Sequence, residues 1–341
     1  MSKRICLLLS HAIEEHDMIR LLHGLGYEVF SIGGYIDPSA PHDGKRPALP
    51  QVPCQRDLKA VVDALGTPDN LGAAQSHIPD AVLEWLGDDG VVMQHHLMER
   101  MYSQWPRLLD WKRGAPGRRV VWRSVGQTDP NTERTAAFYR AQGLERVAYS
   151  PKEADIPEHA GYDALIRFYV DPDEWGGWTG EDAVVTNVTQ KLFQRGSATS
   201  PWFWMMATEG LPAVPLGEGT DAGILPLEEM KARLRRARAD LYTGTRPASY
   251  TLGFIEALMT GIPVVSIGPK AWGQGIDWLP GVFEAHELVE SSDEPVIARD
   301  RLTFLLENHD YAVALSEEQR ARAIETFGIE RVGADWARFL G

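Results

Sequence analysis

The chain has 341 residues, of which 44% are hydrophobic and 24% charged, and its net charge is −14. The length exceeds one ordinary hydrophobic core and suits two domains, and the composition is that of a globular protein. The acidic balance excludes a uniformly basic nucleic-acid surface, although it is compatible with a local basic groove. Two cysteines are too few for a disulfide framework, and no stretch has the length of a membrane helix or the pattern of a secretory leader. We therefore expect a cytoplasmic protein, and the lack of a Cys/His cluster predicts no bound metal.

Short apolar segments alternate with helical patterns in the first half of the chain, which is typical of parallel α/β units. A helix is predicted over 17–25, and residues 36–56, rich in Pro, Asp and Gly, are predicted to form a loop. The predicted strands are 4–9, 27–32, 91–95, 119–123, 146–149 and 164–170.

A break in this pattern at 171–181 predicts a hinge, after which a second α/β series begins. Its predicted strands are 183–188, 213–216, 240–243 and 263–267, and its predicted helix is 227–239. A capping box of Ser316 and Gln319 is predicted to begin the last helix. We expect one domain over 1–175 that also includes the terminal helix 325–341, and a second over 176–324. Open α/β sheets bind ligands at the carboxyl ends of their strands, so we expect a cleft there.

The segment 243–265 carries the most informative pattern. A predicted strand ends at 243, and a loop over 244–250 leads into a predicted helix over 251–260, with Ser249 expected as its N-cap. Gly261 is expected to end the helix in the left-handed conformation, and Pro263 prevents its continuation. A helix N-terminus has unpaired N–H groups and a positive dipole end, so this loop suits a diphosphate.

Glu256 lies in the middle of that helix, between the small or polar residues Gly253 and Thr260. One interpretation is a solvated glutamate on an amphipathic helix. The other is a carboxylate that accepts hydrogen bonds from the paired hydroxyls of a ribose.

The segment resembles the donor-binding signature of retaining glycosyltransferases of family 4, which have the GT-B fold. That signature contains two glutamates separated by seven residues. Glu256-Ala257, Gly261 and 263–265, which read Pro-Val-Val, match its second half, whereas Ala248 stands where the first glutamate is expected. The resemblance implies an α/β protein of two doubly wound Rossmann-like domains that face each other across a cleft, with the C-terminal helix crossing back to the first domain.

The resemblance also implies roles for individual residues. Glu256 would bind the ribose of the nucleotide, and the backbone at the helix start would hold phosphates. The donor-binding residues expected there are Ser249, Tyr250, Thr251 and Leu252. Arg195-Gly196 resembles the Lys-Gly pair that neutralises the diphosphate in the family, and Lys191 is the alternative cation because Gln190 replaces the usual arginine.

Two strands of the first half end in residues that suit a polar ligand. The strand at 91–95 ends on His95 and His96. One histidine would cap a turn and the other be solvated, or one would face the sugar or a phosphate. Arg123 ends the next strand and would form either a surface ion pair or an anion contact. After the first strand, 11–14 (His-Ala-Ile-Glu) stands in place of the family's Gly-Gly loop.

Two further motifs allow other interpretations. Asp171 and Asp173 fit the Asp-X-Asp pattern with which single-domain, metal-dependent GT-A glycosyltransferases hold Mg²⁺ or Mn²⁺ on the diphosphate. The segment 231–238 contains five basic residues, which would form a solvated helix face or contact a phosphate backbone.

The sequence therefore predicts a retaining, metal-independent glycosyltransferase of the hexosyltransferase type. Its donor would be a nucleoside-diphosphate sugar, with a UDP-sugar favoured, and its acceptor a hydroxyl group. Residues 122–127 and 247–252 resemble motifs of stand-alone glycosyltransferases of tailed phages, which makes a hydroxymethylated DNA base in the host cytoplasm one candidate acceptor. A small molecule or a glycan precursor is another. The alternatives are a GT-B-type nucleotide-sugar epimerase and a GT-A-like transferase that uses Asp171 and Asp173. The oligomeric state is left open.

Overall fold

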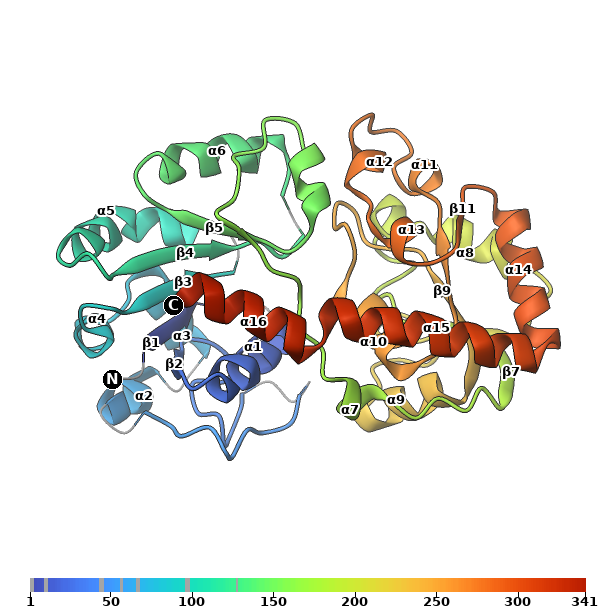
Figure 1. The fold of residues 1–341 in the computed structure, drawn as a ribbon, viewed down its shortest axis with the longest axis horizontal. Coiled ribbons are helices and arrows are strands. Elements are labelled where there is room, and N and C mark those ends of the chain that lie inside the picture. The colour runs from blue at the N-terminus through green and yellow to red at the C-terminus, as the bar shows by residue number, and fades with distance from the viewer. Residues whose placement is uncertain are drawn as a thin grey trace.

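The computed structural model describes residues 3–8, 12–42, 46–55, 58–65, 68–95, 99–126 and 128–341. Figure 1 shows two α/β domains side by side, with the C-terminal helix running back from the second domain onto the first. Each domain is built on one parallel sheet. The boundary predicted at 175/176 lies between the last strand of the first sheet and the first strand of the second.

The first domain contains a six-stranded sheet with the order β2-β1-β3-β4-β5-β6. Its strands are β1 (Arg4–Leu8), β2 (Glu28–Ser31), β3 (Val91–Gln94), β4 (Arg119–Arg123), β5 (Glu145–Ala148) and β6 (Ala164–Leu165). Its helices are α1 (Ala12–Gly24), α2 (Lys59–Leu65), α3 (Pro68–Ser76), α4 (Asp80–Leu86), α5 (Glu99–Arg113) and α6 (Pro130–Arg140), followed by the 3₁₀ helix η2 (Pro151–Asp155). Successive side chains of a strand point to opposite faces, so Cys6 and Leu8 pack in one core and Ile5 and Leu7 in the other.

The second domain contains a five-stranded sheet with the order β11-β10-β9-β7-β8. The short helix α7 (Pro172–Trp175) precedes it at the predicted hinge. Its strands are β7 (Asp182–Asn187), β8 (Ala213–Pro215), β9 (Ala237–Tyr242), β10 (Val264–Ile267) and β11 (Ser291–Ser292). Its helices are η3 (Gly196–Ala198), α8 (Pro201–Ala207), α9 (Leu227–Arg236), α10 (Leu252–Thr260), α11 (Pro269–Trp272), α12 (Leu279–Val282), α13 (Ala285–Leu288), α14 (Pro295–Glu307) and α15 (His309–Phe327).

The last helix, α16 (Ile329–Leu340), packs on the first domain (Figure 1). Trp336 of this helix is fully buried, and its ring lies 5.6 Å from the guanidinium of Arg123 on β4. The side chain of Arg119, also on β4, donates a hydrogen bond to the backbone oxygen of Phe339 at 2.6 Å. The chain therefore crosses twice between the domains, once at α7 and once at α16.

Several element predictions are wrong at their ends. Residues 237–239 were predicted to be helical but belong to β9, since Ala237 and Ala239 are buried in the second core. The strand predicted over 164–170 has only two residues, and α1 begins five residues earlier than predicted. Helical and extended segments of buried apolar residues look alike in sequence, so only the packing decides between them.

The predicted capping box is also wrong. Ser316 lies in the middle of α15, which begins at His309. The side chain of Gln319 accepts a hydrogen bond from the backbone N–H of Val264 at 2.8 Å and donates one to its carbonyl at 2.9 Å. This side chain therefore binds the start of β10 and does not cap a helix.

Among the described residues, none of the helices combines the length and the apolar character that crossing a membrane requires.

Asp240 on β9 is a buried carboxyl group whose burial raises its pKa to about 7. The Thr186 hydroxyl donates a hydrogen bond to this carboxyl group at 3.2 Å. Between the ordinary pKa near 4 and about 7, the folded chain keeps a proton that the unfolded chain releases, so raising the pH across this window destabilises the fold.

We predict that Asp240→Asn removes this pH dependence. Between pH 5 and pH 8, the parent protein should lose about 2 kcal/mol of unfolding free energy through this group, and the variant should not show this loss. Urea unfolding at the two pH values measures this difference. The exposed Asp221→Asn serves as the control and should show the same loss as the parent, and equal pH profiles for Asp240→Asn and the parent would refute the prediction.

Candidate functional site

A cavity of about 260 Å³ lies between the two domains, at the carboxyl ends of their strands. The first domain lines it with Ile13 and Glu14 after β1, Arg46 from the loop over 36–56, Val125 after β4, and Phe168. The second domain lines it with Val188, Thr189, Gln190, Arg195, Met230, Thr245, Ala248, Tyr250, Thr251, Leu252, Gly253 and Glu256. The sequence prediction of a cleft between two α/β domains is thus consistent with the position of this cavity.

The N-terminus of α10 faces this cavity. Its N-cap is Thr251, whose hydroxyl accepts a hydrogen bond from the Phe254 N–H at 3.4 Å. The prediction of Ser249 as N-cap is wrong by two residues. Ser249 lies in the loop before the helix, where its carbonyl accepts hydrogen bonds from the N–H groups of Glu284 and Ala285. Gly261 ends the helix with φ of 93°, in the left-handed conformation expected of it.

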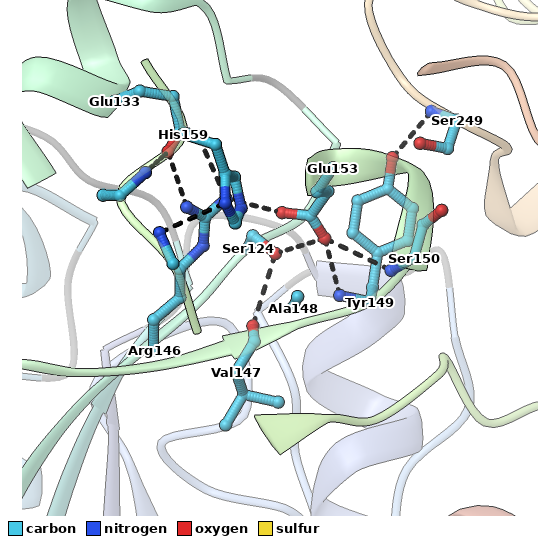
Figure 2. A network of polar contacts seen from close by, with 12 residues as sticks. Ser124, Glu133, Arg146, Val147, Ala148, Tyr149, Ser150, Glu153, His159 and Ser249 are labelled. Carbon is cyan, nitrogen blue, oxygen red and sulfur yellow. Dashed lines mark hydrogen bonds and ion pairs between the residues drawn. The ribbon is translucent and has the colours of Figure 1, made fainter. Parts of the chain in front are cut away.

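The loop before α10 is held by the first domain. The phenol oxygen of Tyr149, just after β5, accepts a hydrogen bond from the backbone N–H of Ser249 at 2.7 Å, as Figure 2 shows. The Tyr250 hydroxyl donates in turn to the backbone oxygen of Tyr149, also at 2.7 Å. Both tyrosines are buried, and burial raises the pKa of each phenol above its ordinary value, so both keep their protons. The two domains therefore share a buried hydrogen-bonded contact directly beside the candidate phosphate site.

A buried ion-pair network fixes Tyr149 in turn (Figure 2). The guanidinium of Arg146 on β5 lies 2.6 Å from a carboxylate oxygen of Glu133 and 2.8 Å from one of Glu153. Burial opposes the charge of Arg146, but the two glutamates outweigh it and raise its pKa. Glu153 also accepts hydrogen bonds from the backbone N–H of Tyr149 at 2.7 Å and from the hydroxyl of Ser124 at 2.8 Å. These ion pairs and hydrogen bonds fix the end of β5, although Nε of Arg146 has no hydrogen-bond partner among the described residues.

Glu256 lies in the cavity wall and is paired with a residue of the other domain. Its side chain is only 5% exposed, and its carboxylate accepts a hydrogen bond from the guanidinium of Arg46. The same guanidinium lies 5.5 Å from the ring centre of Trp175. Burial raises the pKa of Glu256, and the charge of Arg46 acts in the opposite direction. The interpretation of Glu256 as a solvated glutamate is wrong, because nearly all of its surface is covered.

The candidate residues of the first domain lie behind the cavity wall. Arg123 is fully buried, donates to the backbone oxygens of Ala148 and Ile166, and does not reach the cavity surface. Burial lowers its pKa, and the nearby Glu14 opposes this effect. His95 is fully buried as well, and its Nδ1 atom lies 3.2 Å from the carboxylate of Glu14. His96 lies outside the described residues. The structure thus places His95 and Arg123 on either side of Glu14.

The candidate cations of the second domain differ from each other. Arg195 is exposed, lines the cavity and forms no ion pair with any described residue. Lys191 is not part of the cavity lining, and its ammonium lies 3.2 Å from the carboxylate of Glu218. Gln190 lines the cavity and accepts a hydrogen bond from the Glu218 N–H at 2.8 Å. Arg195 is therefore the better-placed cation for a diphosphate.

Asp171 and Asp173 are not arranged as a metal site. Asp171 caps α7 by accepting from the Asp173 N–H at 3.0 Å, and its other oxygen accepts from Arg20 at 2.6 Å. The GT-A alternative is also wrong in fold, because a second complete parallel sheet follows. Over the described parts of the chain, no group of three or more His, Cys, Asp and Glu side chains is arranged to hold a metal ion.

The basic segment 231–238 is largely engaged within the protein. Lys231 is buried against the carboxylates of Glu174 and Glu228. The guanidinium groups of Arg235 and Arg238 donate to backbone oxygens of neighbouring segments. The other two arginines pair with glutamate or aspartate. The interpretation as a solvated helix face is therefore wrong in part, because Lys231 and Arg238 are buried and Arg238 lies in β9.

Three residues of the site had no clear signal in the sequence. Arg46 lies in a loop without a motif, and its contact with Glu256 spans 210 residues. Tyr149 follows a strand like many other aromatic residues. Glu14 was noticed only as part of the segment that replaces a Gly-Gly loop. Such long-range contacts depend on how two domains meet, which no local pattern encodes.

Comparison with known proteins places the fold. No protein-family model matches the chain, and no curated protein matches it. A glycosyltransferase from Rickettsia africae is similar in structure with a TM-score of 0.61 and 11% identity, over 99% of this chain and 98% of that one. Anabaena HepE, solved with UDP and glucose, gives a TM-score of 0.62 and 12% identity over 100% and 99% of the two chains. TarM gives 0.54 and 12% identity, over 76% of this chain and 58% of its own.

These likenesses, together with the two facing sheets, define the fold as GT-B. Two parallel-sheet α/β domains face each other across a cavity, and the chain returns to the first domain at α16. The predicted fold class is thereby confirmed.

We predict that Tyr149→Phe weakens the contact between the domains. The substitution leaves the buried Ser249 N–H without its acceptor, which should cost about 1–3 kcal/mol of unfolding free energy. Urea unfolding measures this loss, and hydrogen exchange at the Ser249 amide should become faster. Tyr162→Phe, at a partly exposed ring, is the matched control and should change neither quantity. Unchanged exchange at Ser249 in Tyr149→Phe would contradict the assignment.

Proposed function

We propose that the protein is a glycosyltransferase that moves a sugar from a nucleoside-diphosphate sugar to an acceptor hydroxyl. The observation that carries this proposal is the combination, in one interdomain cavity, of the α10 N-terminus with the buried carboxylate of Glu256. The helix N-terminus suits a diphosphate and the carboxylate suits a ribose diol. HepE, which has a similar fold, was solved with UDP-glucose, and this supports a UDP-sugar as the donor.

The residues of the site would act by binding and by stabilising charge. The N–H groups at Thr251, Leu252 and Gly253 and the guanidinium of Arg195 would stabilise the negative charge that develops on the departing diphosphate. The interdomain contact through Tyr149 would hold these groups in position before the donor binds. The resemblance of 256–265 to family 4 supports transfer with retention of the anomeric configuration and without a metal ion.

Arg46 is expected to keep Glu256 ionised. Without a cation, a buried carboxylate takes up a proton more readily, and a protonated Glu256 would accept fewer hydrogen bonds from a ribose. The ion pair would also hold the first domain against the second when the site is empty. Donor binding would then require the ribose hydroxyls to share or replace the contact of Arg46 with Glu256.

The acceptor would be a hydroxyl-bearing molecule that enters from the first domain. A hydroxymethylated DNA base is supported by the likeness of 122–127 and 247–252 to phage enzymes. The net charge of −14 and the internal ion pairs of α9 favour a small acceptor or a glycan precursor. Turnover assays with a hydroxymethylated oligonucleotide and with small alcohols distinguish these classes.

The first experiment is a thermal-shift screen with UDP-, GDP-, ADP- and dTDP-sugars, because a ligand that binds only the folded state raises the unfolding temperature. One nucleotide series should stabilise the protein well above the others. No stabilisation by any of them would overturn the proposed donor class. The stabilising donor is then incubated alone, and stoichiometric isomerisation without an acceptor would identify an epimerase in place of a transferase.

We predict that Glu256→Gln weakens nucleotide binding by about 1–3 kcal/mol, because hydrogen bonds to an ionised carboxylate are lost. Isothermal titration with UDP measures the dissociation constant. Glu318→Gln, at an exposed carboxylate of α15 away from the cavity, is the matched control and should bind UDP as the parent does. A dissociation constant that is the same in Glu256→Gln and in the parent would remove Glu256 from the donor site.

We predict that Arg46→Met shifts the pH dependence of UDP binding upward. Arg46 lowers the pKa of Glu256, so its removal raises that pKa, and the carboxylate is protonated at a higher pH. As the pH falls from 9 to 5, binding by the variant should therefore weaken earlier than binding by the parent. Titrations with UDP across this range measure the two midpoints. Coincident midpoints would show that Arg46 does not control the ionisation of Glu256.

A further inference from the structure

Glu14 is a nearly buried carboxylate at the floor of the cavity. It lies in the first turn of α1, directly after β1, and only 4% of its surface is exposed. It nevertheless lines the cavity together with Ile13. A carboxylate in such a place is costly unless charged or polar neighbours compensate it.

Two neighbouring strands provide this compensation. In the sheet order, β1 is followed by β3 and β4, so the residues after these strands meet at one edge. Nδ1 of His95, after β3, lies 3.2 Å from one carboxylate oxygen of Glu14, and Nε of Arg123, at the end of β4, lies 3.5 Å from the other. Arg123 is itself fixed by backbone oxygens and by the ring of Phe168, 4.9 Å away. The carboxylate of Glu14 thus lies beside two residues in fixed positions, and one of them, Arg123, is a cation.

The next residue shows what a purely structural glutamate does in this fold. Glu15 accepts hydrogen bonds from the Ser31 hydroxyl at 2.6 Å and from the backbone N–H groups of Gly34 and Tyr35 at 2.9 and 2.8 Å. It therefore holds the loop after β2 and does not line the cavity. Glu14 lines the cavity instead, and its two carboxylate oxygens lie beside the fully buried side chains of His95 and Arg123.

The position of Glu14 relates it to the part of the donor beyond the diphosphate. Glu256 is paired with Arg46 at the candidate ribose end, whereas Glu14 lies beside Arg123, at the end of β4. The chain after β4 leads to Val125 in the cavity wall and to Gly126, against which Ala248 packs. A donor with its ribose at Glu256 and its diphosphate at the α10 N-terminus would then have its sugar on the side of the cavity where Glu14 and Ala248 lie.

The second domain leaves the sugar end without a carboxylate of its own. Ala248 lines the cavity, and it packs against Gly126 of the first domain so closely that a Cβ on Gly126 would lie 2.8 Å from the Ala248 Cβ. This close packing leaves little room for a longer side chain in that direction. Apart from Glu256, the carboxylate among the described residues that line this cavity is that of Glu14.

We propose that Glu14 binds hydroxyl groups of the transferred sugar and selects a neutral, hydroxyl-bearing hexose against an anionic sugar such as a uronic acid. The proposal rests on the donor site described above. An ionised carboxylate accepts hydrogen bonds from sugar hydroxyls, whereas a second carboxylate brought into the same buried space is repelled. Glu14 would thus be a specificity-determining residue, with His95 and Arg123 as the residues that position it.

The test uses Glu14→Gln, which keeps the shape of the side chain and removes its charge. The probes are UDP, UDP-glucose and UDP-glucuronic acid, with donor hydrolysis or transfer as the readout. In the variant, the dissociation constant of UDP should stay within twofold of the parent value. Its kcat/KM for UDP-glucose should fall roughly 10- to 100-fold, as for a lost hydrogen bond to a charged group. Its preference for UDP-glucose over UDP-glucuronic acid should fall at least tenfold.

The second variant is Glu14→Asp. It keeps the negative charge, but its side chain is shorter by one methylene group, so the carboxylate is drawn back from the sugar. It should lose turnover of UDP-glucose and still reject UDP-glucuronic acid. If the ratio of kcat/KM for UDP-glucose to that for UDP-glucuronic acid is the same in Glu14→Gln as in the parent, the proposed role of Glu14 is overturned. If the parent protein itself binds neither UDP nor UDP-glucose, the proposed UDP donor site fails first, and the two failures are thereby distinguished. A loss of UDP binding in Glu14→Gln alone would overturn the assignment of Glu14 to the sugar end.

Discussion

The contact between Tyr149 and the loop before α10 is the interaction on which the candidate site depends. One phenol oxygen accepts from the Ser249 N–H, and the backbone oxygen of Tyr149 accepts from the Tyr250 hydroxyl, both at 2.7 Å. These groups are buried, so leaving any of them unpaired would cost more than an ordinary hydrogen bond stabilises. The loop before α10 in one domain is therefore held in place by the end of a strand in the other.

This arrangement requires charged side chains to be buried in the first domain. Arg146 is completely buried with Glu133 and Glu153, and such a network stabilises a fold only when each member is well paired. Glu153 also accepts a hydrogen bond from the backbone N–H of Tyr149. A polar network of this kind specifies one geometry more strictly than apolar packing, and a site shared by two domains requires such precision.

Opposite charges also meet at the cavity. Arg46 of the first domain pairs with Glu256 of the second, and within the first domain Arg123 lies 3.5 Å from Glu14. In both cases an arginine lies beside a carboxylate of the cavity lining. These contacts fix the positions of the polar groups around the cavity before any ligand is bound.

Much of the architecture follows from local patterns in the sequence. Alternating strands and helices predicted two α/β domains, and the Gly261-Ile262-Pro263 stop after a helix predicted the course of α10 and β10, because turn chemistry and apolar spacing are local properties. The same patterns placed Tyr250, Thr251, Leu252 and Glu256 close together, and the structure brings them to one cavity. Element ends were less predictable, as residues 237–239 and the misplaced N-cap at Ser249 show.

The tertiary structure alone decided which side chains face the cavity. Arg123 and His95 both end strands, as the sequence indicated, but packing against Phe168 and α16 buries Arg123 and leaves Glu14 at the surface of the cavity. The partner of Glu256 is 210 residues away, and the support of Ser249 is 100 residues away. Sequence periodicity determines which face of a helix or strand is apolar, whereas the meeting of two domains determines which polar groups pair. For this protein, the fold could be inferred from the sequence, and the charges that line the cavity became visible only when the two sheets were placed opposite each other.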